Sequence, residues 1–222
     1  MRKFRAIILL CLPLLLSADG NASEWTLSIE KKGVVVHKRE VPGSNLLEFR
    51  VRAQVNAPLL HILSVLQDLS SFKDWDPNFK ELKILERKKD TECVYYYAVK
   101  APWPLQDRDF VAYSKITIDE KNRALRMNDR ETTHPLAPPH PDRVRMPLMR
   151  INWYFKPVSK GKRTLLELTV RSDPGGSLPD SVKNMAGSDS AFAMIDNLRN
   201  RVEGGKFDAA FVRQYAHFEK WH

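Results

Sequence analysis

The chain has 222 residues and a formal net charge of +9 at neutral pH. That length is enough for one domain with a sizeable core. The excess of basic residues suits a contact with an anionic membrane surface or with nucleic acid. Basic and acidic residues interleave without a long Lys/Arg run, however, which favours a mixed, solvated surface over a dedicated basic patch.

The first 22 residues have the pattern of a secretory signal peptide. Three basic residues precede an apolar run over 6–16, which is too short to span a membrane. Small residues stand before the cleavage site that we expect after Ala22. We therefore expect export, into a bacterial periplasm rather than from a eukaryotic cell, and no nucleic-acid partner. An uncleaved anchor or a buried helix is the alternative.

Only one of the two cysteines, Cys93, lies outside the predicted signal peptide. The mature chain therefore has no intramolecular disulfide, and its core must hold the fold together. A cysteine without a clear partner is weak evidence for a nucleophile, so we expect Cys93 to be buried and inert.

The first part of the mature chain is predicted to mix helices and strands. Leu47, Phe49 and Val51 alternate with charged residues, which indicates a strand with one wet face. Pro58 favours a helix start, because proline suits the first turn. In chain order we predict a short amphipathic helix over 23–31 ended by Gly33, strands over 34–39 and 47–55, a helix over 57–69, and a loop holding Phe72, Trp75 and Asp76.

Strands then dominate until a long helix near the end of the chain. Period-two alternation around Trp153 and around Leu168 indicates an antiparallel sheet with one covered face. The predicted strands lie near 79–87, 91–100, 108–117, 123–130, 148–157 and 163–171. Pro179 opens a helix over 179–203, which Gly204-Gly205 ends. This order predicts an α+β fold, a curved antiparallel sheet wrapped around a C-terminal helix.

Three parts of the chain are therefore expected: a signal peptide over 1–22, one domain over 23–203 and a tail over 204–222. The tail has Phe207, Phe211, Tyr215 and Phe218 at helical spacing. A segment this short forms a marginal free helix, so we expect it to fold back onto the domain rather than to contact a membrane.

The stretch from Cys93 to Val111 is the most informative in the chain. An aromatic strand runs into a Pro-Trp-Pro bend, and Arg108-Asp109 opens the next strand. A charged pair at a strand start costs desolvation unless both partners are satisfied. Alternation places the two side chains on opposite faces, each with its own partner. We interpret the pair as mainly structural, pinning the bend through charge-assisted hydrogen bonds.

This stretch and several shorter motifs resemble the START (steroidogenic acute regulatory protein-related lipid transfer) domain family over residues 24–202. The motifs are Trp25, Gly33-Val-Val-Val-His-Lys-Arg, Asp68 with Trp75-Asp76, Lys100-x-Pro-x-Pro-x-x-x-Arg-Asp-Phe-Val, Val144-Arg145 and Asp173-Pro-Gly-Gly-x-x-Pro. The resemblance implies a helix-grip fold with an internal tunnel that holds one lipid or other apolar molecule. The pattern of apolar residues by itself favours an ordinary filled core.

Sterol-binding members of that family place an acid and an arginine inside the tunnel, at positions that correspond here to Tyr95 and Ser114. We hypothesise that these two hydroxyls face the ligand as a neutral pair, which avoids the cost of burying ions; core residues satisfied by backbone or water are the equal alternative. The tunnel candidates are Tyr95, Tyr97, Arg108, Phe110, Ser114, Met127, Met149, Trp153, Met185 and Phe192. The last helix and the loop near 119–122 are the expected lid.

The predicted function is non-enzymatic binding, and possible intermembrane transfer, of a lipid or other hydrophobic ligand, with transient contact to an anionic membrane. We expect no cofactor, no metal and no catalytic residue. His134 and His140 lack a third ligand, and no nucleophile motif or phosphate loop is present in the sequence. An enzyme of the wider helix-grip superfamily, resembling its cyclases and hydrolases, and a protein-interaction module with a filled cavity are the alternatives.

Overall fold

The computed structural model describes residues 23–205 and residues 208, 210, 212, 213 and 215, without the side chains of residues 185 and 186. The predicted signal peptide over 1–22 and the tail residues Phe207, Phe211 and Phe218 lie outside the described residues. Within the described tail, Val212 and Tyr215 are buried, and the Tyr215 hydroxyl donates to the Asp90 carbonyl.

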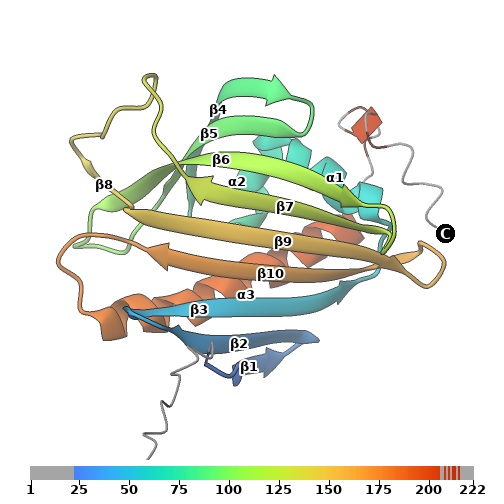
Figure 1. Cartoon of the computed structure of the whole chain (residues 1–222), viewed down its shortest axis with the longest axis horizontal. Coiled ribbons are helices and arrows are strands. Elements are labelled where there is room, and N and C mark those ends of the chain that lie inside the picture. The colour runs from blue at the N-terminus through green and yellow to red at the C-terminus, as the bar shows by residue number, and fades with distance from the viewer. Residues whose placement is uncertain (1–22, 206–207, 209, 211, 214, 216–222) are drawn as a thin grey trace, which may run out of the picture.

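The described residues form one open, mostly antiparallel sheet with helices on one face (Figure 1). The strands are β1 (Thr26–Lys31), β2 (Val34–Val41), β3 (Ser44–Val55), β4 (Phe79–Lys89), β5 (Glu92–Val99), β6 (Asp107–Asp119), β7 (Ala124–Glu131), β8 (Arg143–Arg145), β9 (Leu148–Val158) and β10 (Arg163–Asp173). The helices are α1 (Leu59–Gln67), the short 3-10 turn η1 (Leu69–Ser71), α2 (Phe72–Trp75) and α3 (Asp180–Gly204).

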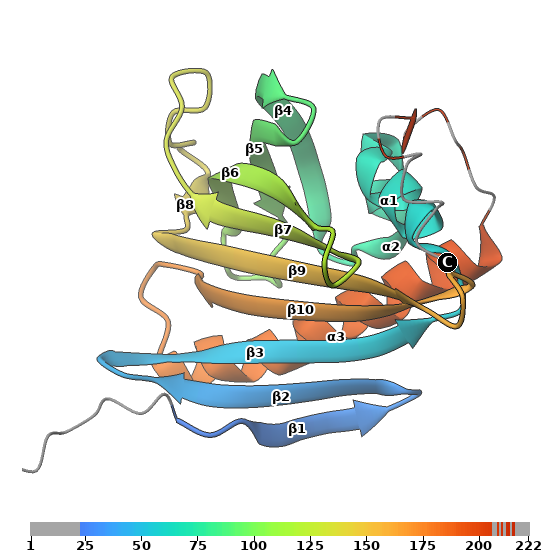
Figure 2. The same ribbon diagram turned by 45° about the vertical axis from the view of Figure 1, so that its right-hand side comes forward.

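The sheet bends around its helices. Its strands follow the order β1-β2-β3-β10-β9-β7-β6-β5-β4, and β8 pairs in parallel with β6. Figure 2 shows β4, β5 and β6 rising away from β1, β2 and β3, with α1, α2 and α3 on the same side of the sheet. The predicted α+β helix-grip architecture is therefore confirmed. None of the described helices has the length and apolar character of a membrane span.

Residues 26–31 form strand β1, so the prediction of a short helix over 23–31 is wrong. Lys32 and Gly33, which follow it, have φ angles of 52° and 73°. Two consecutive positive φ angles suit a tight hairpin turn that matches the twist of paired strands. The turn places β1 beside β2, with Lys31 opposite Val34. Hydrogen bonds to a neighbouring strand thus override the local helical pattern.

Two further elements differ from the prediction. Residues 72–75, expected in a loop, form the single turn α2, and the Asp68 side chain caps the 3-10 turn before it by accepting from the Ser70 amide at 3.0 Å. Strand β8, which has only three residues, was not expected. Its partner strand β6 is far away in the sequence, and a segment this short carries no readable alternation.

The inner face of the sheet packs against α3 through an extensive apolar core. Val36, Val51, Leu168, Ile195 and Leu198 are among the fully buried members of this core. The helix approaches β3 closely at Gly187, where an added Cβ atom would lie 2.3 Å from a ring carbon of Phe49. Glycine at this position therefore allows the contact between helix and sheet.

Polar contacts also tie α3, along its length, to β3 and to residues beside the ends of the first three strands. The Leu47 amide donates to the Asn184 side chain at 2.9 Å, Lys32 pairs with Asp196 at 2.8 Å, and the Asn56 amide donates to Glu203 at 2.7 Å. A lid made by α3 would have to break such contacts. The opening of a lid through movement of this helix therefore stays a prediction, and it would require the loss of these polar contacts.

Candidate functional site

The inner faces of β5, β6 and β7 bring predicted site residues together. Tyr95 lies opposite Ala112, and Ser114 lies opposite Asp129. Ala112 is small, so the Tyr95 ring extends across β6 toward β7. The Tyr95 hydroxyl donates to Asp129 Oδ2 at 3.2 Å. The predicted sharing of one face by Tyr95 and Ser114 is thus seen in the structure, and it reveals a third member of the group.

Asp129 changes the electrostatics that we expected at this place. Its side chain is only 5% exposed, and burial raises the pKa of its carboxyl to about 6, although hydrogen bonds from Ser114 and Tyr95 act in the opposite direction. Burial, followed by the nearby Asp129 charge, also raises the pKa of the Tyr95 hydroxyl well above its usual value. The two hydroxyls are therefore not an isolated neutral pair, because Tyr95 donates to a buried acid that lies opposite Ser114.

Asp129 was not among the predicted site residues, because its polar neighbours obscure which face of the strand its side chain occupies. In the run Arg126-Met127-Asn128-Asp129-Arg130, polar residues stand on both faces of the strand. Met127 lies opposite Trp153, and Asp129 lies opposite Ile151, both on the inner face. Counting in steps of two from the buried Leu125 would have placed an acid inside.

Part of the inner face near this group is not sealed by side chains. Tyr95, Met127, Ile151 and Phe192 are only partly buried, although helices lie on the same side of the sheet. Other inner-face residues that pack against α3, such as Leu168, are fully buried. This difference in burial indicates that the inner face is incompletely packed beside Asp129.

Two other inner-face candidates, Tyr97 and Arg108, form hydrogen bonds within the protein. The Tyr97 hydroxyl donates to the buried Asp76 carboxylate, which also accepts from the Asn78 amide at 2.9 Å. The Tyr97 hydroxyl thus already has an acceptor. Arg108 is buried and donates to the Gln106 carbonyl. This contact holds the bend before β6.

The remaining candidates divide between two apolar clusters. Phe110 and Met149 belong to a buried cluster with Tyr97, whereas Trp153 belongs to the α3 core, where it stacks on Phe155 with ring centroids 5.7 Å apart. The Met185 side chain lies outside the described residues. Met127 and Phe192 border the incompletely packed region, which makes them the better candidates for contact with a ligand.

Asp109 lies on the opposite, outer face, as the alternation predicted. Its carboxylate accepts from Arg145 Nε at 2.6 Å and from the Tyr96 hydroxyl at 2.9 Å. Arg145 Nη2 in turn donates to the carbonyls of Ala137 and Pro138, at 3.2 and 3.1 Å. The network ties the proline-rich loop between β7 and β8 to the sheet, and Ala137 packs there against the buried residues of β5 and β6. These contacts fit the structural role that we predicted for Asp109.

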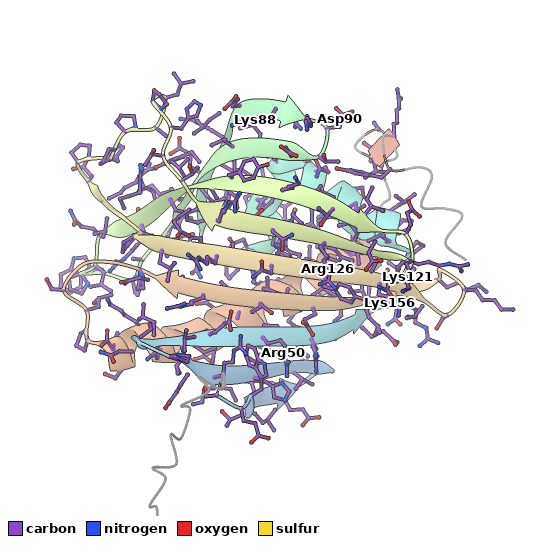
Figure 3. All side chains as sticks on the ribbon, viewed as in Figure 1. Arg50, Lys88, Asp90, Lys121, Arg126 and Lys156 are labelled. Carbon is purple, nitrogen blue, oxygen red and sulfur yellow. The ribbon has the colours of Figure 1, made fainter. Side chains whose placement is uncertain are left out.

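A hollow of about 460 Å³ opens at the turns that join β6 to β7 and β9 to β10. Four basic residues, Lys121, Arg123, Lys156 and Lys160, line it together with neutral residues. Figure 3 shows Lys121 and Lys156 close to each other at one end of the sheet, with Arg126 nearby. Basic residues far apart in the sequence thus meet at one place on the surface.

No group of three His, Cys, Asp or Glu side chains that suits a metal ion occurs in the part of the chain that the structure describes. His134 and His140 each accept a hydrogen bond from a nearby backbone amide through Nδ1. Burial raises the pKa of the Cys93 thiol, and the Asp129 charge adds to this shift. A raised pKa disfavours the thiolate, so Cys93 is a poor nucleophile.

The START domain model matches residues 12–204. An uncharacterised protein of Pseudomonas aeruginosa is 24% identical over 84% of this chain and 91% of its own length. Mouse phosphatidylcholine transfer protein is 28% identical over 75% of this chain and 78% of its own length.

Among solved structures, the STAR-related lipid transfer protein of Xanthomonas axonopodis is similar, with a TM-score of 0.72 and 26% identity over 80% of this chain and 98% of that one. Relatives with these names support lipid binding in general. Fold, motifs and matches agree that the chain belongs to the START domain family.

Proposed function

We propose that the chain binds one lipid or other hydrophobic molecule between the sheet and α3, without changing it chemically, and transfers it between membranes. The observation that carries this proposal is the incompletely packed inner face around Met127, Ile151 and Phe192, beside a buried polar group. A hydrocarbon chain placed there would leave water, at a gain of about 25 cal/mol per Å² of apolar surface.

Native mass spectrometry of the protein purified from its host tests the binding step. We expect a folded species heavier than the chain by the mass of one lipid, which denaturation releases. A species of unliganded mass that also fails to take up lipid from vesicles would contradict the proposal, and would favour a filled cavity that serves protein contacts.

The basic hollow formed by Lys121, Arg123, Lys156 and Lys160 is the proposed contact with an anionic membrane. Each basic residue near such a surface contributes about 1 kcal/mol. Replacing Lys121 and Lys156 with Ala should therefore slow lipid transfer to vesicles that contain phosphatidylglycerol by about ten-fold or more. Transfer to purely zwitterionic vesicles should change little.

Lys88 provides the matched control for this double variant. It lies on β4, away from the hollow (Figure 3). Lys88→Ala removes a surface charge without touching the hollow, and should leave transfer to both kinds of vesicle unchanged. Equal slowing by Lys88→Ala would show a general charge effect and contradict this surface as the docking site.

We also propose that the chain is exported to the periplasm after cleavage near Ala22, as the residue pattern over 1–22 suggests. The intact mass of the protein from a periplasmic extract tests this. A mature chain that starts at Ser23 is expected, whereas a cytoplasmic, uncleaved chain would contradict the proposal.

One observation favours enzymatic activity as the second candidate function. A buried carboxyl whose pKa is raised to about 6 has the acid–base strength that catalysis uses near neutral pH. Mass analysis of the bound molecule before and after long incubation separates the two functions, because a carrier leaves the mass unchanged and an enzyme alters it.

A further inference from the structure

Four aspartates are buried in the described part of the chain: Asp76, Asp109, Asp129 and Asp196. Asp109 pairs with Arg145, and Asp196 pairs with both Lys32 and Arg199. Asp76 accepts hydrogen bonds at both carboxyl oxygens. Asp129 differs from these three, because its Oδ1 atom is buried and has no hydrogen-bond partner.

None of the groups in direct contact with Asp129 is a cation. Tyr95 donates to its Oδ2 atom, Ser114 lies opposite it on β6, and Cys93 lies on the same face of β5 as Tyr95. Arg126 and Arg130 are its basic neighbours on β7, but they extend from the outer face over the rings of Tyr154 and Tyr113. Arg108 and Arg87 also lie on this face, but Arg108 donates to the Gln106 carbonyl and Arg87 is exposed opposite Cys93. Among the described residues, neither forms an ion pair with Asp129.

A buried carboxylate with a free oxygen is costly, since removal from water is offset neither by an opposite charge nor by a full set of hydrogen bonds. Buried polar atoms in folded proteins nearly always have partners. An unpaired atom beside an incompletely packed region is therefore a place where a ligand supplies the missing partner.

We propose that Asp129 anchors the ligand, and that the polar end of this ligand is an ammonium group with at least one N–H. The inference rests on the proposed lipid binding. Such a group donates a charge-assisted hydrogen bond to the free Oδ1 atom and neutralises the buried charge at the same time. A hydroxyl group would supply only the hydrogen bond.

The surroundings also suit an amphiphilic molecule. Met127 and Ile151 lie next to the acid on β7 and β9, and Phe110 packs against Tyr95 with ring centroids 6.0 Å apart. Methionine adapts its shape to different hydrocarbon chains. The inferred ligand class is a lipid with a cationic, N–H-bearing head and an apolar tail.

This arrangement differs from the one that the resemblance to sterol-binding family members implies. At the two positions where that resemblance implies an acid and an arginine, this chain has Tyr95 and Ser114. Here the acid lies one strand away, at Asp129, and Ser114 in place of the arginine leaves its charge unpaired. A group of this kind selects for a cation rather than for a neutral hydroxyl.

The test compares four ligands with the same hydrocarbon chain: oleylamine, oleyl alcohol, oleic acid and oleyltrimethylammonium. Binding to lipid-free protein at pH 7.5 is followed by tryptophan fluorescence below the critical micelle concentrations. We expect oleylamine to bind at least about ten-fold more tightly than oleyl alcohol, and oleic acid to bind most weakly.

Two variants show whether Asp129 is responsible. Asp129→Asn keeps the shape of the side chain and should abolish the preference for the amine while still binding the alcohol. Asp90→Asn, on the exposed turn between β4 and β5 (Figure 3), removes the same charge elsewhere and should keep the preference.

Equal binding of amine and alcohol to the wild-type protein would overturn the inference and leave the proposed function intact. The same holds if Asp129→Asn retains the preference. If oleyltrimethylammonium binds as tightly as oleylamine, the inference that the ligand must have an N–H group is overturned. Failure of all four ligands to bind would overturn the proposed function itself, and the inference with it.

Discussion

Two buried acids on neighbouring strands of one sheet, Asp109 and Asp129, have opposite surroundings. Asp109 is 0% exposed on the outer face and accepts hydrogen bonds from Arg145 and Tyr96. Asp129 is 5% exposed on the inner face, contacts two hydroxyls and keeps one oxygen free. Burial alone therefore does not separate a structural acid from a ligand-binding one. The two acids differ instead in whether every carboxyl oxygen has a hydrogen-bond partner.

The difference follows from what covers each face. The proline-rich loop closes over Asp109, and Arg145 binds both the acid and the loop carbonyls. Over Asp129 the side chains leave the packing incomplete, as the partial exposure of Met127 and Ile151 shows. One acid completes a structural network, and the other is available for a molecule that the chain itself does not contain.

The largest expected effect is that of Asp109→Asn. The substitution leaves the Arg145 guanidinium without its anionic partner, and breaking a buried pair in this way typically costs about 3 kcal/mol or more. We expect the free energy of unfolding, measured with urea at pH 7.5, to fall by about that amount. Ligand preference should persist in the folded fraction. A loss below about 1 kcal/mol would mean that the Asp109 network is not structural.

Asp129→Asn should change stability in the opposite direction at neutral pH. The pKa of Asp129 is raised by burial from 3.8 to about 6, so the folded chain binds this proton more tightly than the unfolded chain. The wild-type protein is therefore relatively more stable at low pH and loses that stability as the pH rises through about 6. At one pKa unit per 1.36 kcal/mol, the loss is at most about 3 kcal/mol.

The measurement compares urea unfolding of Asp129→Asn and wild type between pH 3.5 and 7.5. We expect the variant to be the more stable at pH 7.5, with the difference shrinking below pH 6 and levelling near pH 4. Asp90→Asn, the exposed control, should show no such trend. A variant less stable than wild type at pH 7.5 would indicate that Asp129 supports the fold, as Asp109 does.

The smallest expected effects come from the adjacent tyrosines on β5. Tyr95→Phe removes the donor to Asp129 Oδ2, which should lower the free energy of unfolding by about 1 kcal/mol. It should also raise the pKa of Asp129 further, because that hydrogen bond stabilises the charged carboxylate. Carboxyl carbon NMR shifts during a pH titration would show the change.

Tyr96→Phe is the matched control on the opposite face. It removes the hydroxyl that donates to Asp109, so a comparable loss of stability is expected, about 1 kcal/mol. The Asp129 titration should not move. If the Asp129 pKa shifts as much in Tyr96→Phe as in Tyr95→Phe, groups on the two faces of the sheet are electrostatically coupled.

Much of the fold could be predicted from local patterns. Alternation identified the strands around Trp153 and Leu168, and proline and glycine marked the ends of the last helix close to Asp180 and Gly204. The same rule placed Arg108 and Asp109 on opposite faces with different partners. These features depend on residues next to one another in the chain, where geometry allows few choices.

The elements that were predicted wrongly or not at all depend on contacts with distant strands. Residues 26–31 became a strand because β2 offers hydrogen bonds, and β8 exists because β6 lies beside it. Neither partner is visible in the local pattern of the segment itself. Pairing with a neighbour determines the state of short or ambiguous segments.

By itself, the sequence determined the family, the order of elements and the place of Tyr95 and Ser114 on the inner face. Only the tertiary structure decided that the two hydroxyls meet the carboxyl of Asp129. Three strands supply the three groups, and the register between β5, β6 and β7 brings them together. A shift of one residue in that register would turn the acid to the outer face. Such pairing depends on contacts between distant residues, which local alternation does not encode.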